Sequence, residues 1–349
     1  MNTDTRSLFV ALLATTLVAI LDLWTGGSAV LLGFLIAGPL LAAVSLGARR
    51  TAAVAGYAAV LAVLLGVPDG IFGSIDHMIR CLVVAAGGAF CTFIAGRRSQ
   101  RERALLRMTR VAEVAQRAIL RPVPSRAGRV ALAVRYLSAA EDSVVGGDFY
   151  DVAVTPYGVR LVVGDVKGKG LEAVQLAATV LGSFRQAAFT QEDLRSLAAE
   201  LDRSASRQLA EEDFVTAVLA EFGPAGQLKL VNCGHPPPLL LRGGGIRALA
   251  PGTPTTPLGL DPDPEVERLE LVPADRLLLY TDGLVEARDG QGRQFEMDDR
   301  TAAELLAARS LDQALDGLVA SVLRHAGGRL DDDLALVLAQ RRPALRRAA

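Results

Sequence analysis

The chain has 349 residues, enough for more than one domain, and a formal net charge of only -1 at pH 7. Its mean hydropathy of +0.32 is uneven: residues 8–96 are mostly apolar, whereas the sequence after Arg97 has the charged composition of a soluble protein. A single soluble domain is therefore excluded. The three cysteines have no metal-ligand spacing and indicate neither an oxidising compartment nor a zinc site.

Four apolar stretches occupy the N-terminal part, at residues 8–23, 29–46, 52–67 and 77–95. Each approaches the roughly 20 residues that a helix needs to cross a bilayer, although the first and third lie near the lower limit of about 17. A buried helix of a soluble domain explains one such stretch but not four in succession. We therefore predict an all-α membrane domain with four transmembrane helices over residues 1–96. A cleaved signal peptide is disfavoured, because no short apolar segment stands apart from the later ones.

The charges between these stretches predict an orientation. The basic residues fall on one side of a four-span topology: Arg6, Arg49, Arg50, Arg97, Arg98, Arg101 and Arg103. The other side carries Asp22, Asp69 and Asp76, and Arg80 is an exception that can pair with Asp76. Because basic loops stay in the cytoplasm, we expect a multi-pass protein of the cell membrane, in contact with lipid, whose N-terminus and C-terminal domain are cytoplasmic.

Residues 97–122 are predicted to form a cytoplasmic connector helix, since neither Gly nor Pro occurs before Pro122. An apolar seam follows one face of this helix at spacings of 3, 4, 3 and 4: Leu105, Met108, Ala112, Ala115 and Ile119. Two interpretations of the seam stay open. It packs on the following domain, or it pairs with a second copy of the chain in a homodimer.

The remaining residues, 123–343, alternate between strand and helix patterns. Strands are predicted at 129–137, 149–154, 159–166, 214–222, 228–232, 239–242, 277–281 and 334–339. Helices are predicted from 171, over 193–209 and twice within 300–325. Because hairpin turns join many of the strands, we expect mostly antiparallel sheets with helices packed outside, an α+β domain rather than a doubly wound one.

Four of the predicted strands carry a carboxylate at one end. Asp148 follows a glycine pair, Asp165 ends the apolar run 159–163, Asp282 follows the strand 277–281, and residues 331–333 are three consecutive aspartates before the last strand. A buried acid at a strand end is costly unless something pairs with it. If the strands are neighbours, the acids converge on one site, and Mg2+ or Mn2+ takes oxygen ligands of this kind.

Single motifs have other interpretations. Asp148 could belong to a Gly-Gly-Asp-Glu-Phe cyclase signature, but the Glu is missing, and the loop around Asp165 does not match the order of a phosphate-binding P-loop. His235, between a glycine and three prolines, is interpreted as a structural turn residue rather than a general acid or base. Lys167 and Lys169 either attract an anionic substrate or are solvated loop charges.

Five segments together resemble a known family. They are Val145-Gly-Gly-Asp-Phe-Tyr-Asp, Gly164-Asp-Val-Lys-Gly-Lys-Gly, Asn232-Cys-Gly-His-Pro-Pro-Pro-Leu-Leu, Leu278-Leu-Tyr-Thr-Asp-Gly-Leu-Val-Glu and Asp331-Asp-Asp-Leu-Ala-Leu-Val-Leu. In order and spacing they resemble the motifs of metal-dependent serine/threonine phosphatases of the 2C class, and within it the bacterial SpoIIE-type (RsbU-like) branch. The resemblance spans residues 112–340 and leaves out the membrane half. It implies a β-sandwich with helices on both faces and a two-metal site.

The resemblance also implies roles. Asp148, Asp165, Asp282 and Asp332 would hold two Mn2+ or Mg2+ ions, with the carbonyl of Val166 as a further ligand. The choice between Asp332 and Asp333 stays open, and the phosphate-binding arginine of eukaryotic relatives has no counterpart. A metal-activated water would hydrolyse phosphoserine or phosphothreonine on a cytosolic protein, and the resemblance suggests a STAS-domain anti-sigma factor antagonist. No nucleic acid is expected as a partner. The rival is a catalytically silent membrane sensor that only binds a partner, which a test of metal-dependent activity would discriminate.

Overall fold

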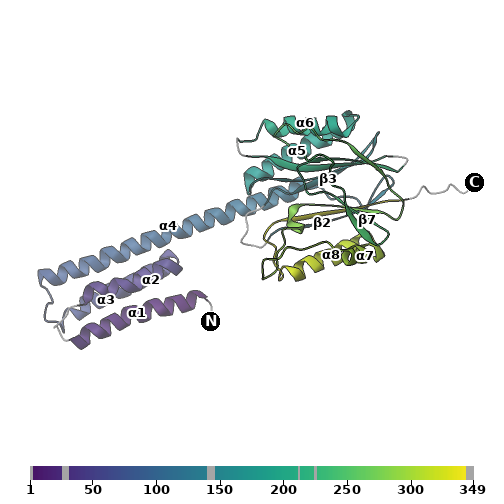
Figure 1. The fold of residues 1–349 in the computed structure, drawn as a ribbon. Coiled ribbons are helices and arrows are strands. Elements are labelled where there is room, and N and C mark those ends of the chain that lie inside the picture. Colours follow the sequence, from purple (N-terminus) through teal and green to yellow (C-terminus); the bar gives the residue numbers. More distant parts are fainter. Residues whose placement is uncertain (1–2, 26–30, 140–145, 211–212, 224–225, 343–349) are drawn as a thin grey trace, which may run out of the picture. The chain divides into compact units, whose positions relative to one another are not determined.

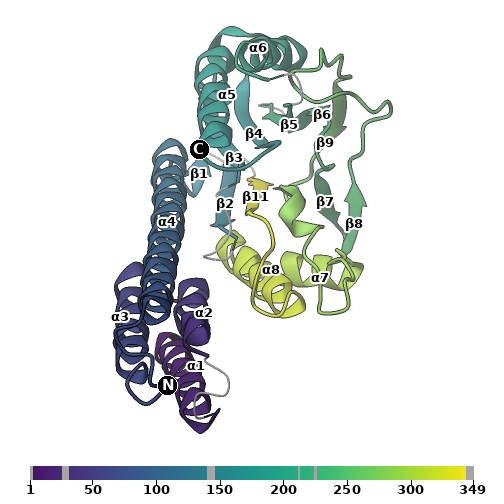
Figure 2. The same cartoon turned by 90° about the vertical axis from the view of Figure 1, so that its left-hand side faces the viewer.

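The computed structural model describes residues 3–25, 31–139, 146–210, 213–223 and 226–342. The chain forms two compact units, Met1–Arg107 and Met108–Ala349 (Figures 1 and 2). Helix α4 (Ile75–Ile119) is continuous and supplies residues to both units. The predicted connector therefore does not begin at a break in the chain but continues the last apolar helix.

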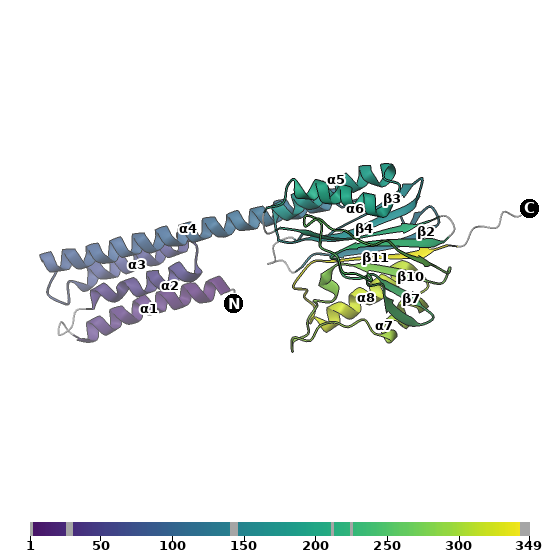
Figure 3. The ribbon, with the colours of Figure 1, turned by 45° about the horizontal axis from the view of Figure 1, so that its top comes forward.

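The N-terminal unit is helical, and Figure 3 shows its helices lying side by side. Its elements are α1 (Thr3–Thr25), the 3-10 helix η1 (Leu32–Ile36), α2 (Ala37–Ser45), α3 (Ala48–Leu65) and the first part of α4. Helices α1, α3 and α4 are long and apolar enough to cross a membrane. They also expose large apolar side chains, among them Phe9, Leu64 and Phe90. These three helices are candidate membrane spans.

The second apolar stretch is shorter than predicted. It forms the five-residue η1 and the nine-residue α2, together about 24 Å long, against roughly 30 Å for a hydrocarbon core. Pro39 provides the reason, because it lacks the amide hydrogen that a regular helix would use and its ring crowds the preceding turn. The α-helical hydrogen bonding of this stretch is therefore confined to its second half.

One end of the N-terminal unit gathers three segments that are distant in the sequence. Arg50, near the start of α3, pairs with Asp4 of α1 at 2.5 Å. Arg98 of α4 donates to the carbonyl of Leu46, just after α2, at 3.2 Å. Small residues allow the helices to approach closely, since a Cβ added to Gly88 would lie only 2.8 Å from the Cβ of Ala55. The start of α1, the α2–α3 turn and the region of α4 near Arg98 thus share one end.

The C-terminal unit is built on two antiparallel sheets (Figure 1). The six-stranded sheet has the order β1-β2-β11-β10-β7-β8, and the five-stranded sheet has the order β3-β4-β5-β6-β9. The strands are β1 (Arg126–Ala127), β2 (Val130–Leu137), β3 (Phe149–Thr155), β4 (Gly158–Val166), β5 (Val215–Phe222), β6 (Gln227–Cys233), β7 (Leu239–Arg242), β8 (Gly245–Ala248), β9 (Glu267–Glu270), β10 (Arg276–Tyr280) and β11 (Leu334–Arg341).

Three apolar cores show that this unit has four layers. One core lies between the sheets and includes Leu161, Val218 and Val337. A second joins the five-stranded sheet to α5 (Leu171–Thr190) and α6 (Leu194–Ser206), and a third joins the six-stranded sheet to α7 (Asp299–Ala307) and α8 (Leu311–His325). The predicted α+β sandwich with helices on both faces is confirmed.

Besides the two-residue β1, two further short strands were not predicted, β8 and β9. The glycines at 243–245 were expected to close a strand, but Gly243 and Gly244 have positive φ and form the turn of a hairpin between β7 and β8. Strand β9 lies at the edge of the other sheet. Both strands leave half or more of their side chains at the surface, so neither has the apolar pattern that reveals a buried strand.

The apolar seam of the connector divides at about Ala112. Ala112 is fully buried against Val174 of α5, with Ala115 and Ile119 packed beside it. Met108, by contrast, is 67% exposed. The C-terminal half of the seam therefore packs on the following domain, as one of the two interpretations held, and its N-terminal half leaves apolar surface uncovered.

Candidate metal centre

Three of the predicted acids lie together at one end of the sandwich. In the five-stranded sheet Phe149 is opposite Gly164, which brings Asp148 next to Asp165. In the other sheet, Asp282 directly follows Thr281, whose amide donates to Ala335 at 3.1 Å. One carboxylate oxygen from each of Asp148, Asp165 and Asp282 lies within 4.8 Å of the other two. The two sheets thus contribute to one acidic cluster.

Thr281 joins the two halves of this cluster. Its hydroxyl donates to Oδ2 of Asp148 at 2.6 Å and accepts from the amide of Ala335 at 2.8 Å. The side chain is fully buried, so the bond is shielded from water. Sequence reasoning missed this residue, and its only signal was its place directly before Asp282.

The glycine pair before Asp148 has a steric role. A Cβ on Gly147 would lie 2.7 Å from the carbonyl oxygen of Val166 and 2.5 Å from its Cβ, closer than real atoms approach. Only glycine therefore allows the start of β3 to lie against the end of β4. The same contact places the carbonyl of Val166 beside the acidic cluster. Val145, the first residue of the motif, lies outside the described residues.

The three consecutive aspartates have different environments. Asp331 is exposed. The carboxylate of Asp333 is buried and accepts four hydrogen bonds, from the Tyr136 hydroxyl (2.5 Å), the Ser138 hydroxyl (3.2 Å), the Ala139 amide (2.7 Å) and the Gly146 amide (3.0 Å). The side chain of Asp332 is 35% exposed, and its Oδ1 lies 3.1 Å from Nζ of Lys169. Asp333 thus links residues at the end of β2 to Gly146, just before β3, by hydrogen bonds. Asp332 remains accessible.

Burial and mutual repulsion disfavour the charged form of the clustered acids. Burial, followed by the charge of Asp165, raises the pKa of Asp148 well above its usual range. Burial and the charge of Asp282 raise the pKa of Asp165 to about 7, and burial with the charge of Asp332 raises the pKa of Asp282. A bound divalent cation would remove this penalty. An all-oxygen donor set of this kind fits Mg2+ or Mn2+.

His235 holds the sheets together rather than acting as a base. Its Nε2 donates to the carbonyl of Tyr280 at 2.9 Å, so its Nδ1 accepts from the hydroxyl of Thr216, also at 2.9 Å. Burial lowers the pKa of His235 to about 4, and the ring is therefore neutral near pH 7. This arrangement agrees with the structural role predicted from the surrounding glycine and prolines.

Comparison with known proteins identifies the domain. The family model described as Stage II sporulation protein E (SpoIIE) matches residues 155–342, more than half of the chain. The RsbU and RsbW domains of Rv1364c from Mycobacterium tuberculosis are 30% identical, with a TM-score of 0.54; the match covers 61% of this chain and only 60% of that one. The SiaA-PP2C domain of Pseudomonas aeruginosa is 23% identical, with a TM-score of 0.57 and coverage of 71% and 100%, and shows the same fold.

The sandwich that carries the acidic cluster therefore has the fold of the 2C class of phosphatase domains. Within that class, the chain belongs to the SpoIIE family. The resemblance noted in the sequence is therefore confirmed at the level of fold and family. The N-terminal unit lies outside the matched residues.

Proposed function

We propose that this protein is a membrane-anchored, Mn2+- or Mg2+-dependent phosphatase that removes phosphate from phosphoserine or phosphothreonine of a cytosolic regulatory protein. The observation that carries the proposal is the convergence of three carboxylates from both sheets within 4.8 Å, in a domain of the SpoIIE family. Resemblance to RsbU-like phosphatases supports a phosphorylated STAS-domain anti-sigma factor antagonist as the substrate.

Asp148, Asp165, Asp282 and Asp332, with the carbonyl of Val166, are the proposed ligands of two metal ions. Asp332 is preferred over Asp333 because the four hydrogen bonds to Asp333 already occupy its carboxylate. When bound, two divalent ions lower the pKa of a water and stabilise negative charge on phosphoryl oxygens.

The chain's own residues orient these groups for the reaction. Thr281 fixes the rotamer of Asp148 through its 2.6 Å hydrogen bond, so that the carboxylate oxygen without this bond can face the metal. The reaction requires no covalent intermediate on a side chain.

Lys169 is the proposed contact for the substrate phosphate. A pocket of about 330 Å³ begins at Val166, directly after Asp165, and is lined by the loop 166–169, the start of α5 and residues 208, 210 and 213. Lys169 lines this pocket, and its ammonium group pairs with Asp332 at the edge of the cluster. A phosphoryl group entering from this side would meet a cation next to the proposed ligands.

The division of the chain supports a membrane anchor followed by a cytoplasmic enzyme. We propose a membrane domain over 1–96, a connector over 97–122 and the phosphatase domain over 123–343, the last residue of which lies just beyond those described. The exposed apolar side chains of α1, α3 and α4 support membrane insertion. We propose that η1 and α2 form a shorter fourth pass, and with four passes the arginine distribution supports a cytoplasmic location for both ends.

The connector contacts the proposed metal site directly. Gln116 of α4 is 2% exposed, and its side-chain amide donates to the backbone carbonyls of Gly146 (3.1 Å) and Asp148 (3.5 Å). We propose that movement of α4 alters the position of Asp148 and hence the catalytic rate. The exposed apolar surface at Met108 and Val111 supports pairing of two connectors in a homodimer.

The activity can be tested with the full chain in lipid nanodiscs. Phosphate release from a phosphoserine peptide should require Mn2+ or Mg2+ and stop in EDTA. Asp165→Asn should lower turnover by more than about 100-fold, since even groups that only support metal ligands contribute about 10- to 100-fold. Asp331→Asn, an exposed aspartate beside the site, is the matched control and should keep full activity. Metal-independent turnover, or full activity of Asp165→Asn, would refute the proposal.

A further inference from the structure

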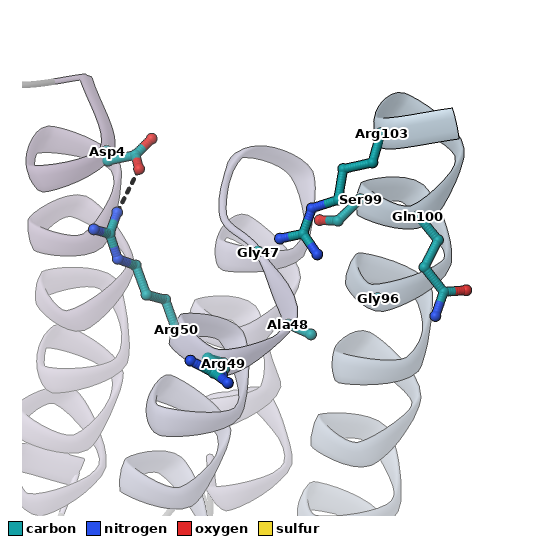
Figure 4. Close-up of a pocket in the computed structure, with 9 residues that line it drawn as sticks. All are labelled: Asp4, Gly47, Ala48, Arg49, Arg50, Gly96, Ser99, Gln100 and Arg103. Atoms are coloured by element: carbon teal, nitrogen blue, oxygen red, sulfur yellow. Dashed lines mark hydrogen bonds and ion pairs between the residues drawn. The ribbon is translucent and has the colours of Figure 1, made fainter. Parts of the chain in front are cut away.

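A pocket of about 630 Å³ lies at one end of the N-terminal unit, where α1 begins, α2 turns into α3 and α4 passes residues 96–103 (Figure 4). Its walls are in contact: a Cβ on Gly47 would lie 3.7 Å from the hydroxyl of Ser99, and one on Gly96 would lie 3.6 Å from the Cβ of Ala48. The hydrogen bond from Arg98 to the carbonyl of Leu46 also holds α4 against the turn. The pocket is therefore fixed by contacts between helices.

The pocket is strongly basic. Three arginines and one aspartate line it, a formal net charge of +2. Arg50 is neutralised by Asp4 at 2.5 Å. Among the described residues, neither Arg49 nor Arg103 has an ion-pair partner. In Figure 4 the side chain of Arg103 reaches from α4 toward the turn at Gly47. Two guanidinium groups are thus available to an anion.

The start of α3 adds to this positive field. The N-cap of this 18-residue helix is Gly47, which has no side chain to accept hydrogen bonds from the first turn. The positive end of the helix dipole therefore lies at the wall of the pocket, where an anion is favoured. Guanidinium groups match phosphate oxygens in a two-point geometry. Arg49, Arg103 and the helix start together fit a phosphate group.

The surroundings indicate which molecule carries the phosphate. Toward the middle of the helices, large apolar side chains lie at the surface, including Val44 (74% exposed) and Phe93 (60% exposed). In the other direction α4 exposes arginines such as Arg101 and Arg107. A soluble phosphate would use only the arginines, whereas a phospholipid would use both surfaces.

We propose that this pocket binds the phosphate of an anionic phospholipid headgroup. The proposal depends on the membrane anchoring inferred above, but not on the phosphatase reaction.

The test measures binding of fluorescent phosphatidylglycerol to the full chain in detergent micelles. In about 0.3 M salt the Debye length is about 6 Å, so attraction to arginines that do not contact the lipid is largely screened. Arg49→Gln combined with Arg103→Gln should weaken binding by about 30-fold. This value assumes that each arginine attracts the lipid as strongly as a basic residue near an anionic membrane surface does. The matched control is Arg101→Gln with Arg107→Gln, which removes the same charge from positions that do not line the pocket. It should change affinity by less than about threefold, since neither residue lines the pocket and salt screens attraction beyond direct contact.

Four further measurements make the result decisive. Circular dichroism and Mn2+-dependent turnover of a soluble phosphoester should be equal in both double variants, which separates this site from the catalytic one. Recovery of the chain in carbonate-washed membranes tests the anchoring by itself. Equal weakening by the two double variants would overturn the pocket as the site. Complete displacement of the lipid by about 1 mM free glycerol phosphate would overturn the lipid as the source.

Discussion

The three consecutive aspartates before β11 allow a sharp test of the proposed metal centre. Substituting each by asparagine changes the charge by the same amount at adjacent positions. The structure nevertheless predicts three different results, because the three side chains have different surroundings. Asp331 is exposed, Asp332 lies beside the acidic cluster, and Asp333 is buried and accepts a hydrogen bond from the Gly146 amide.

Asp333→Asn should destabilise the fold. Asparagine keeps one acceptor oxygen, but its amide group would face two of the four donors that the carboxylate now satisfies. The hydroxyl on that side can rotate and accept from the amide, so one backbone N–H, that of Ala139 or Gly146, is left without an acceptor, at a cost of about 1–3 kcal/mol. For a unit of this size, the midpoint of thermal unfolding should fall by on the order of 5 °C.

Asp332→Asn should have the opposite effects, with stability retained and metal binding lost. Its ion pair with Lys169 is partly exposed and contributes at most about 1 kcal/mol, and the substitution also relieves repulsion with Asp165 and Asp282. Stability should therefore change little, whereas Mn2+ binding and turnover should fall. Asp331→Asn should alter neither property.

Calorimetric unfolding of the full chain in EDTA, combined with titration of free Mn2+ by electron paramagnetic resonance, measures both quantities. An Asp333→Asn variant with an unchanged unfolding midpoint but no Mn2+ binding, together with normal binding by Asp332→Asn, would refute the assignment.

Three further predictions concern protonation, topology and the connector. Because the folded pKa of Asp165 is raised to about 7, the metal-free fold should lose stability as pH rises from about 4 to 7. Mn2+ must displace this proton, so its apparent affinity should rise by up to about tenfold per pH unit below pH 7 and level off above pH 7. A calorimetric stability of the metal-free protein that does not change with pH would contradict the protonation of Asp165. A reporter fused after Gly96 should be cytoplasmic and one near Gly70 external, and the reverse result at either position would exclude the four-span topology. Met108→Lys should weaken self-association in sedimentation velocity without changing the rate of the monomer, whereas Ala115→Glu, beside the buried contact with α5, should lower the rate itself. Identical behaviour of both variants and the wild type would make the connector a passive tether.

The sequence by itself determined the features that depend on local pattern. Apolar length revealed the helices of the N-terminal unit, and alternation with turn residues revealed the buried strands. Acids at strand ends pointed to one site, because a carboxylate after a buried strand needs a partner. Asp148, Asp165 and Asp282 do lie together, as that reasoning required.

The tertiary structure decided what depends on contacts between distant residues. Asp332 and Asp333 are chemically identical, and only the approach of Tyr136 and the Gly146 amide, nearly two hundred residues earlier, distinguishes their environments. The bond from Thr281 to Asp148 exists only because the two sheets face each other. The seam of the connector divides where α5 happens to cover Ala112. Periodicity reports which face of an element is apolar, but the partner that covers this face is set by packing across the whole chain.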